Sequence, residues 1–305
     1  MAIRVHVNDP LDDEAMELLR TKSDLEVTAE HHDKDKLKEI MPEIEVLVVR
    51  SATKVTADVI EAGKKLRIIA RAGVGLDNID LEKAKEKGIT VLNTPAASSI
   101  SVAELTIGMM FALSRHIARG TMDLKEGKWT KKQLKGVELT GKTLGIIGLG
   151  RIGREVAKRA IGLGMNVIGY DPFVKEIDMD VELVKLDELY EKADYITVHV
   201  PLIPETKHLI NKEAIDKMKK GVFILNCARG GVVDEKALLD ALKEGKVAGA
   251  GLDVFETEPP TSDVEKELLS MPNVVATPHI GASTKEAQKR VGKEIVQKIF
   301  EALGV

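Results

Sequence analysis

The chain has 305 residues, of which 44% are hydrophobic and 31% are charged, a composition typical of a folded globular protein and not of a disordered or fibrous one. Its formal net charge of −4 argues against a general nucleic-acid binder, because such proteins present a basic face. The single cysteine, Cys227, excludes an internal disulfide and a cysteine-rich zinc site, and we expect no metal.

The N-terminal segment lacks the apolar core of a secretory signal. The longest apolar stretch, residues 102–113, contains Glu104 and is too short to cross a bilayer. We therefore expect a cytoplasmic protein without a membrane partner, and the abundance of lysine and glutamate favours a thermophile. A chain of 305 residues lies at the upper limit for one hydrophobic core, so two domains are expected.

In the first third of the chain, short apolar runs alternate with helical patterns, a rhythm that predicts a parallel sheet with crossover helices. The expected strands are Ile3–Val7, Leu25–Thr28, Val46–Val49, Arg67–Ala70 and the edge strand Thr90–Leu92. The expected helices between them include Asp13–Arg20, Lys34–Ile40 and Ala57–Ala62.

A strand ends near Pro95, and a long helix follows in which Ser101 and Glu104 have the spacing of a capping box. A second series of strands is then expected at Thr143–Ile147, Asn166–Tyr170, Tyr195–Val198, Val222–Leu225, Val247–Leu252 and Val274–Ala276.

The last helix, Ser283 to Ala302, is long and amphipathic and is expected to return to the first domain. The sequence thus predicts an α/β protein with two doubly wound parallel-sheet domains, Rossmann-like or flavodoxin-like, separated by a cleft. Residues 1–96 with 283–305 form a discontinuous substrate-binding domain, and residues 97–282 form a nucleotide-binding domain. Ligands are expected at the carboxyl ends of the strands.

The most informative motif is G-x-G-x-x-G at Gly148, Gly150 and Gly153, between a buried strand and a helix. Gly148 permits a tight turn, Gly150 admits a pyrophosphate to the backbone, and Gly153 lets helix and strand pack closely. Asp171 follows at the end of the next apolar run, where a carboxylate accepts hydrogen bonds from ribose hydroxyls and repels a 2′-phosphate. We therefore expect NAD rather than NADP; a turn or capping role is the alternative for Asp171.

Three further residues are candidates for chemistry. Arg229 follows a buried strand and precedes two glycines, so its guanidinium suits a carboxylate, although a surface arginine in a turn would look the same. His279 lies in a glycine-containing loop, where imidazole is the usual base for oxidising an alcohol. Glu258, before Pro259, is the carboxylate that would orient it. We expect structural roles for the other histidines, His6, His31, His32, His116, His199 and His208, of which His199 most resembles a functional one because it also ends a strand.

Two loops of the first domain also follow strands. In Ala72-Gly73-Val74-Gly75, free N–H groups would form a nest for a carboxylate, unless this is an ordinary tight turn. Arg50-Ser51-Ala52-Thr53-Lys54 places two cations and two hydroxyls in one loop, as a phosphate site or a solvated loop would.

Four motifs occur in a fixed order: Gly-Leu-Gly-Arg-Ile-Gly from 148, Asn-Cys-Ala-Arg-Gly-Gly from 226, Asp-Val-Phe-Glu-Thr-Glu-Pro from 253 and Pro-His-Ile-Gly-Ala from 278. Together they resemble the D-isomer-specific 2-hydroxyacid dehydrogenases, over about residues 46–282, and within that family the chain looks most like a D-3-phosphoglycerate dehydrogenase. The resemblance implies NAD-dependent oxidation of D-3-phosphoglycerate to 3-phosphohydroxypyruvate, a reaction of serine biosynthesis, with Arg229, Glu258 and His279 as the catalytic residues.

The same resemblance implies the remaining contacts. Cofactor contacts are implied for Gly148, Gly150, Arg151, Ile152, Gly153, Asp171, Val200, Pro201, Cys227, Ala228, Arg229, Asp253, His279, Gly281 and Ala282. Substrate contacts are implied for Arg50, Ser51, Ala72, Gly73, Val74, Gly75, Asn78, Arg229 and His279. A homodimer through an arm at residues 98–140, which includes Trp129, is also implied.

The chain departs from this pattern in two ways. It ends at Val305 without a C-terminal serine-binding domain, so we expect no feedback inhibition by that route. Lys131 and Lys132 replace a more arginine-rich pattern, which weakens a role of the arm in binding the partner's phosphate. Within the enzyme class, the alternatives are a glyoxylate, hydroxypyruvate or D-lactate reductase. Outside it, the alternative is an NAD-sensing protein like the carboxy-terminal-binding corepressors.

Overall fold

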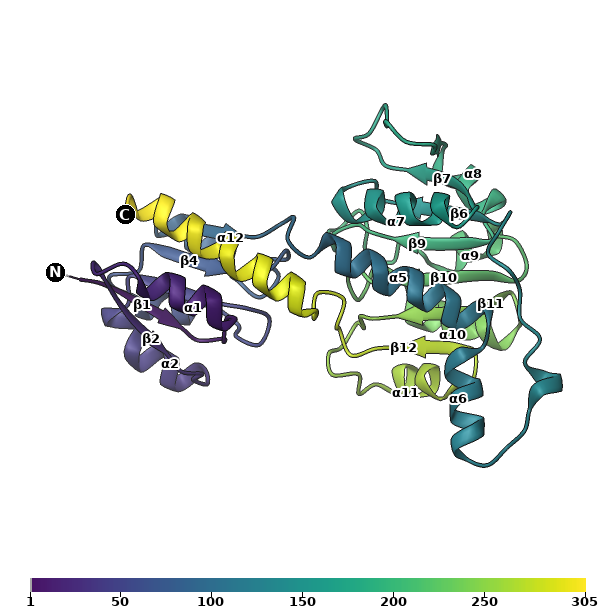
Figure 1. Cartoon of the computed structure of the whole chain (residues 1–305), viewed down its shortest axis with the longest axis horizontal. Helices are drawn as coiled ribbons and strands as arrows, with labels where there is room; N and C mark the ends of the chain where they lie inside the picture. The colour runs from purple at the N-terminus through teal and green to yellow at the C-terminus, as the bar shows by residue number, and fades with distance from the viewer. Residues whose placement is uncertain (1) are drawn as a thin grey trace. The chain divides into compact units, whose positions relative to one another are not determined.

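The structure is a computed structural model that describes residues 2–305 and divides into two compact units (Figure 1). Unit 1 comprises Met1–Ser99 and Ala282–Val305, and unit 2 comprises Ile100–Gly281. Each unit contains one sheet in which every neighbouring pair of strands is parallel.

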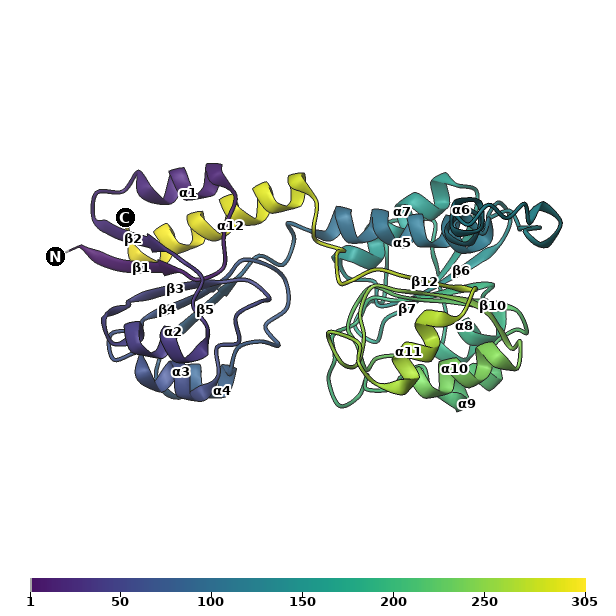
Figure 2. The same ribbon diagram turned by 90° about the horizontal axis from the view of Figure 1, so that it is seen from below.

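Unit 1 is built on a five-stranded sheet with the order β2-β1-β3-β4-β5, which is the flavodoxin-like order. Its strands are β1 (Ile3–Val7), β2 (Leu25–Ala29), β3 (Val46–Val49), β4 (Ile68–Arg71) and β5 (Thr90–Asn93). Helices α1 (Asp13–Arg20) and α12 (Lys285–Leu303) cover one face, while α2 (Lys34–Ile40), α3 (Ala57–Ala62) and α4 (Leu81–Glu86) cover the other (Figure 2). The short 3-10 helix η1 (Met41–Glu43) follows α2.

Unit 2 is built on a seven-stranded sheet with the order β12-β11-β10-β9-β6-β7-β8, a Rossmann-like order in which the direction of strand addition reverses between β6 and β9. Its strands are β6 (Thr143–Ile147), β7 (Asn166–Tyr170), β8 (Glu182–Leu183), β9 (Tyr195–Val198), β10 (Val222–Asn226), β11 (Val247–Leu252) and β12 (Val274–Ala276). The predicted fold class, two doubly wound parallel-sheet domains, is confirmed by both sheets.

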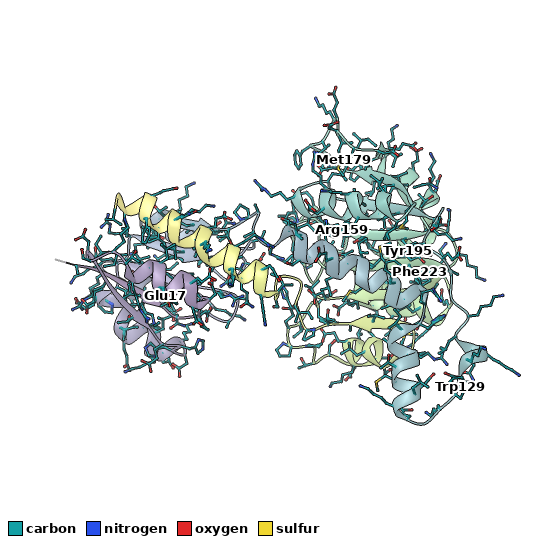
Figure 3. The ribbon with its side chains drawn as sticks, viewed as in Figure 1. Glu17, Trp129, Arg159, Met179, Tyr195 and Phe223 are labelled. Carbon is teal, nitrogen blue, oxygen red and sulfur yellow. The ribbon has the colours of Figure 1, made fainter. Side chains whose placement is uncertain are left out.

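Helices also cover both faces of the sheet in unit 2 (Figure 2). On one face lie α5 (Ser99–Ser114) and α7 (Arg151–Gly162), and on the other lie α8 (Leu186–Lys192), α9 (Lys212–Lys217), α10 (Glu235–Lys243) and α11 (Asp263–Ser270). The aromatic rings of Tyr195 and Phe223 stack at 4.8 Å between centroids, on the neighbouring strands β9 and β10 (Figure 3).

Local sequence explains where most helices begin. The side chains of Asp12, Asp33, Asp80, Asn211, Asp234, Ser262 and Thr284 each accept a hydrogen bond from a backbone N–H in the first turn of the helix that follows. The predicted capping box of Ser101 and Glu104 is wrong, because α5 begins at Ser99 and both residues lie inside it. Glu104 instead forms an ion pair with Arg159 of α7 at 3.0 Å.

The long helix expected after Pro95 is present as α5, and a second helix follows it. Chain direction changes by 63° between α5 and α6 (Ile117–Lys125), and His116 between them has a left-handed φ of 53°. The short 3-10 helix η2 (Lys131–Gln133) follows, and Trp129, labelled in Figure 3, is 81% exposed beside it. No single helix among residues 2–305 is long and apolar enough to span a membrane; α5 and α6 reach that length only as a bent pair.

Candidate active site

The glycine-rich loop between β6 and α7 leaves room for a ligand beside its backbone. Gly148 has a φ of +95°, and a Cβ there would lie 2.5 Å from the carbonyl oxygen of His199, so only glycine fits. A Cβ on Gly153 would lie 2.0 Å from the oxygen of Gly148. At Gly150 a Cβ would meet nothing within 4 Å, and this residue caps α7 without a side-chain hydrogen bond. The main chain at the start of α7 is therefore not covered on the side where a Cβ of Gly150 would lie, which suits a pyrophosphate.

Asp171 connects the end of β7 to this loop. Its Oδ2 accepts a hydrogen bond from the backbone N of Leu149 at 2.9 Å, and its Oδ1 accepts one from the N of Phe173 at 2.9 Å. A carboxylate oxygen can accept more than one hydrogen bond, so both remain able to accept ribose hydroxyls. The turn role considered from the sequence and a ribose role are thus compatible in one side chain.

Val200 and Pro201 lie in the loop after β9, and a Cβ on Gly148 would lie 2.9 Å from Cγ1 of Val200, so this loop borders the glycine-rich turn. His199 forms a hydrogen bond with a side chain of its own strand region: its Nε2 lies 3.0 Å from the Thr197 hydroxyl. Burial lowers the pKa of its imidazole to about 4. An imidazole that resists protonation in this way fits the structural role expected for His199.

The candidate acid–base pair is in direct contact. Nδ1 of His279 lies 2.7 Å from Oε2 of Glu258, and the other oxygen of Glu258 accepts a hydrogen bond from the backbone N of Phe255 at 3.2 Å. The side chains of His279 and Glu258 are 46% and 38% exposed, so both remain accessible to a ligand. Because Nδ1 is engaged, Nε2 is the nitrogen left to exchange a proton.

Electrostatics keep Glu258 charged. Burial opposes its ionisation, but the hydrogen bond and charge of His279, the N–H of Phe255 and the charge of Arg229 outweigh burial and lower the pKa of Glu258. An ionised Glu258 accepts a hydrogen bond from Nδ1 of His279 and fixes the orientation of the ring.

Asp253, directly after β11, shapes the loop that carries His279. It is 1% exposed, and its Oδ1 accepts hydrogen bonds from the N of Ile280 at 2.8 Å and the Thr277 hydroxyl at 2.6 Å. Its Oδ2 accepts one from the N of Gly281 at 2.8 Å. These bonds hold His279 in a left-handed conformation with a φ of 51°. Ala282, also predicted as a cofactor contact, is the first residue after unit 2.

Arg229 lies in a tight turn after β10. The side chain of Asn226 accepts a hydrogen bond from the N of Ala228 at 3.0 Å and donates one to the carbonyl of Arg229 at 2.9 Å. Nη1 of Arg229 donates to the carbonyl of Ala228 at 2.7 Å. The Cys227 thiol is buried against Met109, and burial raises its pKa to about 12, so Cys227 offers a ligand its backbone and not a thiolate.

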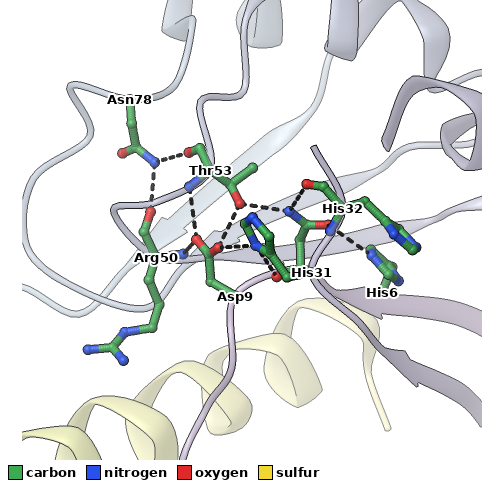
Figure 4. A network of polar contacts seen from close by, with 8 residues as sticks. His6, Asp9, His31, His32, Arg50, Thr53 and Asn78 are labelled. Atoms are coloured by element: carbon green, nitrogen blue, oxygen red, sulfur yellow. Dashed lines mark hydrogen bonds and ion pairs between the residues drawn. The ribbon is translucent and has the colours of Figure 1, made fainter. Parts of the chain in front are cut away.

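In unit 1, the Arg50 loop is held by a buried aspartate (Figure 4). Asp9, 2% exposed, accepts hydrogen bonds from the N of Arg50 at 2.6 Å and from the N and hydroxyl of Thr53 at 3.1 and 2.7 Å. Asn78 donates to the carbonyls of Arg50 and Thr53, both at 2.7 Å. The side chain of Arg50 points away from Asp9 (Figure 4), and no residue of 2–305 forms a hydrogen bond or ion pair with its guanidinium. Ser51 beside it is exposed.

The predicted anion nest after β4 is smaller than expected. The N–H of Gly73 donates to the carbonyl of Arg71 at 2.9 Å and is not free, because the chain turns tightly there. Ala72 is buried, and its N–H donates to Val49. Within the described residues, the N–H groups of Val74 and Gly75 have no backbone partner and remain as donors.

The structure therefore groups the predicted residues as follows. Glu258 and His279 are in contact, with Arg229 close enough for its charge to act on Glu258. The glycine-rich loop, Asp171 and the loop of Val200 form a second group in unit 2. The Arg50 and Gly73 loops belong to unit 1. Sequence reasoning missed Asp9 altogether and missed that the Asp253 carboxylate holds a loop; the available signal was an aspartate just after a buried strand in both places.

A Rossmann-like unit with this glycine-rich loop and an acidic residue at the end of the second strand defines the class of dinucleotide-binding α/β proteins. More specifically, the chain belongs to the D-isomer specific 2-hydroxyacid dehydrogenase family, since residues 107–281 match the NAD binding domain of that family. This match confirms the predicted family and the predicted cofactor, NAD.

Similar proteins of this family carry the names of different enzymes. The chain is 65% identical over 302 residues to a hydroxypyruvate reductase of Thermotoga maritima, covering 99% of both chains. It is 55% identical to a D-3-phosphoglycerate dehydrogenase of Methanocaldococcus jannaschii, covering 99% of this chain but 57% of that one. Among solved structures, D-lactate dehydrogenase from Aquifex aeolicus complexed with NAD and lactic acid is similar with a TM-score of 0.88 and 34% identity, over 99% of this chain and 95% of that one.

Proposed function

We propose that this protein catalyses the reversible NAD-dependent oxidation of a D-2-hydroxy acid to a 2-oxo acid. The observation that carries this proposal is the 2.7 Å contact between Nδ1 of His279 and Glu258 in a member of this family. It is the arrangement that a general base near neutral pH requires: one ring nitrogen fixed by a carboxylate, the other available.

Each residue has one task in this reaction. Nε2 of His279 takes the proton of the C2 hydroxyl, or returns it in reduction, and Glu258 stabilises the charged ring. Arg229 binds the substrate carboxylate, for which its planar guanidinium is suited. Bound NAD supplies the acceptor for the hydride that leaves C2. The N–H groups at the start of α7 would hold the pyrophosphate of NAD, and the Asp171 carboxylate would accept hydrogen bonds from its ribose hydroxyls and disfavour a 2′-phosphate.

For the substrate, we propose D-3-phosphoglycerate, oxidised to 3-phosphohydroxypyruvate as in serine biosynthesis, with unit 1 as the substrate-binding domain. The Arg50 guanidinium supports this choice, because it lies on an ordered loop, and no described side chain neutralises it. A phosphate would supply the missing charge partner. The 55% identity to a D-3-phosphoglycerate dehydrogenase gives the same indication.

A second candidate is reduction of hydroxypyruvate or glyoxylate. It is favoured by the 65% identity to a hydroxypyruvate reductase, which matches this chain over 99% of both lengths. In this case the Arg50 guanidinium would have no phosphate to bind.

We also propose a homodimer formed through the arm at residues 98–140. Large apolar side chains of this arm are exposed, among them Ile117 at 54%, Met122 at 55%, Leu124 at 61% and Trp129 at 81%. A groove of about 750 Å³, lined by residues of α5, α6, α11 and β12, lies beside them within unit 2. Light scattering would detect the dimer, and Trp129→Ser should weaken it.

The test of the substrate is a panel of assays that follow NADH. If NADH forms from 3-phosphoglycerate with a higher kcat/KM than from D-glycerate, the result supports the first candidate. Faster NADH consumption with hydroxypyruvate than with 3-phosphohydroxypyruvate supports the second. Absence of activity on every 2-hydroxy and 2-oxo acid of the panel, in protein that binds NAD, would reject the enzymatic proposal.

A further inference from the structure

The segment that carries Glu258 is held at both ends by one buried carboxylate. Glu265, on the first turn of α11, is fully buried. Its Oε1 accepts a hydrogen bond from the N of Thr257 at 2.8 Å, and its Oε2 accepts bonds from the N of Thr261 at 2.8 Å and the N of Ser262 at 2.7 Å. The two oxygens therefore join the residue just before Glu258 to residues just after it.

Capping of α11 explains only part of this arrangement. Ser262 and Glu265 form a capping box, in which the glutamate needs to accept only the N–H of Ser262. The bonds to Thr257 and Thr261 lie outside that motif and close the loop around Glu258. Burial opposes the ionisation of Glu265, yet the N–H groups of Ser262, Thr257 and Thr261 and the Ser262 side chain outweigh it, so the pKa of Glu265 is lowered. The carboxylate is thus charged when it holds the loop.

A second buried glutamate supports the same segment one residue earlier. Glu235, on the first turn of α10, accepts a hydrogen bond from the N of Glu256 at 2.8 Å. The backbone N–H groups of residues 256, 257, 261 and 262 thus all donate to carboxylates of neighbouring helices. Glu258 is the member of this segment whose side chain reaches His279.

From this geometry, and resting on the proposed function, we propose that Glu265 is a positioning residue: it holds both ends of the 257–262 loop and so keeps Glu258 hydrogen-bonded to Nδ1 of His279. Glu265 itself touches no substrate. Without it, the backbone N–H groups of Thr257, Thr261 and Ser262 lose their common acceptor, the loop rearranges to donate them to water, and Glu258 moves away from the ring. A small misplacement of a catalytic group is enough to slow a reaction strongly.

The test compares Glu265→Ala and Glu265→Gln with Ser262→Ala as the matched control. Ser262→Ala removes the hydroxyl that accepts the N–H of Glu265 but leaves the three bonds made by the Glu265 carboxylate. We expect kcat to fall by about 10- to 100-fold in Glu265→Ala with the KM for NAD unchanged. Glu265→Gln retains one acceptor oxygen and should lose less, and Ser262→Ala should retain kcat although it is less stable.

A double-mutant cycle separates positioning from general stability. In a Glu258→Gln background, Glu265→Ala should cost little further kcat, because the interaction that it protects is already lost. An equal loss in both backgrounds, or a loss of the same size in Ser262→Ala, would overturn the proposal.

A readout that does not depend on turnover keeps this inference separate from the proposed function. With ¹⁵N-labelled histidine, the Nδ1 proton of His279 that bonds to Glu258 can be followed by NMR, using His279→Ala to assign it. The signal should be lost in Glu265→Ala and in Glu258→Gln and retained in Ser262→Ala; its persistence in Glu265→Ala rejects the role of Glu265. Normal turnover of His279→Ala would instead reject the proposed function, whatever the NMR result.

Discussion

Both units hold a loop with the same hydrogen-bonding arrangement, but the two loops present different kinds of side chain. In each, a buried aspartate at the carboxyl end of one strand accepts backbone N–H groups and a threonine hydroxyl from the loop after another strand. Asp9 does this for the Arg50 loop in unit 1, and Asp253 does it for the His279 loop in unit 2.

The difference lies in the side chain that each loop presents. His279 is fixed a second time, by Glu258, whereas no described residue bonds to the guanidinium of Arg50. A group that transfers a proton must be aligned within tenths of an ångström, so a fixed ring is useful. A group that attracts an anion acts over longer distances and can remain mobile on a fixed backbone. The comparison therefore predicts effects on kcat in unit 2 and effects on KM in unit 1.

The largest effect is expected where the fixed ring is removed. His279→Ala should lower kcat by about 10²–10⁴-fold, because a positioned general base is lost, while NAD affinity stays within a few-fold. Steady-state kinetics together with a fluorescence titration of NADH measure both quantities. Turnover near that of the unmodified protein would assign the base elsewhere.

The two aspartates provide the direct test of the comparison. Asp253→Asn and Asp9→Asn should each lower the free energy of unfolding by about 1–3 kcal/mol, since each leaves buried donors poorly paired. Their kinetic effects should differ: Asp253→Asn should lower kcat and Asp9→Asn should raise the KM of the substrate. Denaturant titrations of both variants provide the stability reference, and the same kinetic pattern in both would break the distinction between the two loops.

The free guanidinium can be tested by its selectivity. Arg50→Ala should raise KM about 10-fold for a phosphorylated substrate and much less for its unphosphorylated analogue, because a charge-assisted hydrogen bond is lost only in the first case. Lys54→Ala, an exposed cation in the same loop, is the control and should have a smaller effect. Equal changes for both substrates would remove Arg50 as a phosphate ligand.

The smallest expected effect is a change in the pH dependence of stability, caused by Glu235 beneath the segment that carries Glu258. Burial raises the pKa of Glu235 from 4.5 to about 7; the N–H of Glu256 opposes this, and repulsion by Glu256, Glu265 and Asp234 adds to it. Between pH 4.5 and about 7, Glu235 is deprotonated in the unfolded chain but still protonated in the folded chain. The free energy of unfolding therefore falls as the pH rises through this range, and it levels off above about 7.

Glu235→Gln cannot ionise and should lack this loss. Relative to the unmodified protein it should gain roughly 1–3 kcal/mol at pH 8 and nothing below pH 4. Urea titrations at both pH values measure this, with Glu244→Gln, an exposed position at the end of the same helix, as control. A gain that is the same at both pH values would show that Glu235 does not titrate in this window.

Much of the fold followed from local pattern. Apolar runs flanked by polar residues located β3, β6, β7 and β11 at the residues where the structure has them, because a strand buried on both faces has a nearly continuous apolar sequence. The break between α5 and α6 was not predicted, since the residue in the left-handed conformation is His116 and neither glycine nor proline marks it. The two-residue strand β8 is too short for a pattern.

The candidate site shows a similar limit. The glycine spacing identified the nucleotide loop, and the family resemblance identified Arg229, Glu258 and His279 as residues to compare. The glutamates beneath the site could not be recognised, because Glu235 and Glu265 differ from other helix glutamates only in being buried against backbone N–H groups of the 256–262 segment. Burial of this kind is a property of tertiary structure and leaves no local signal.

Gly230, between the Arg229 turn and the Glu258 segment, restricts how this site can change. A Cβ there would lie 1.7 Å from the carbonyl oxygen of Phe255, so the two chain segments touch through their main chains alone. Even alanine would force one of them to shift. Under the proposed function, a larger residue at this junction would therefore disturb both the turn that carries the carboxylate-binding Arg229 and the segment that carries Glu258, so that changes in substrate choice and in proton transfer would be coupled there.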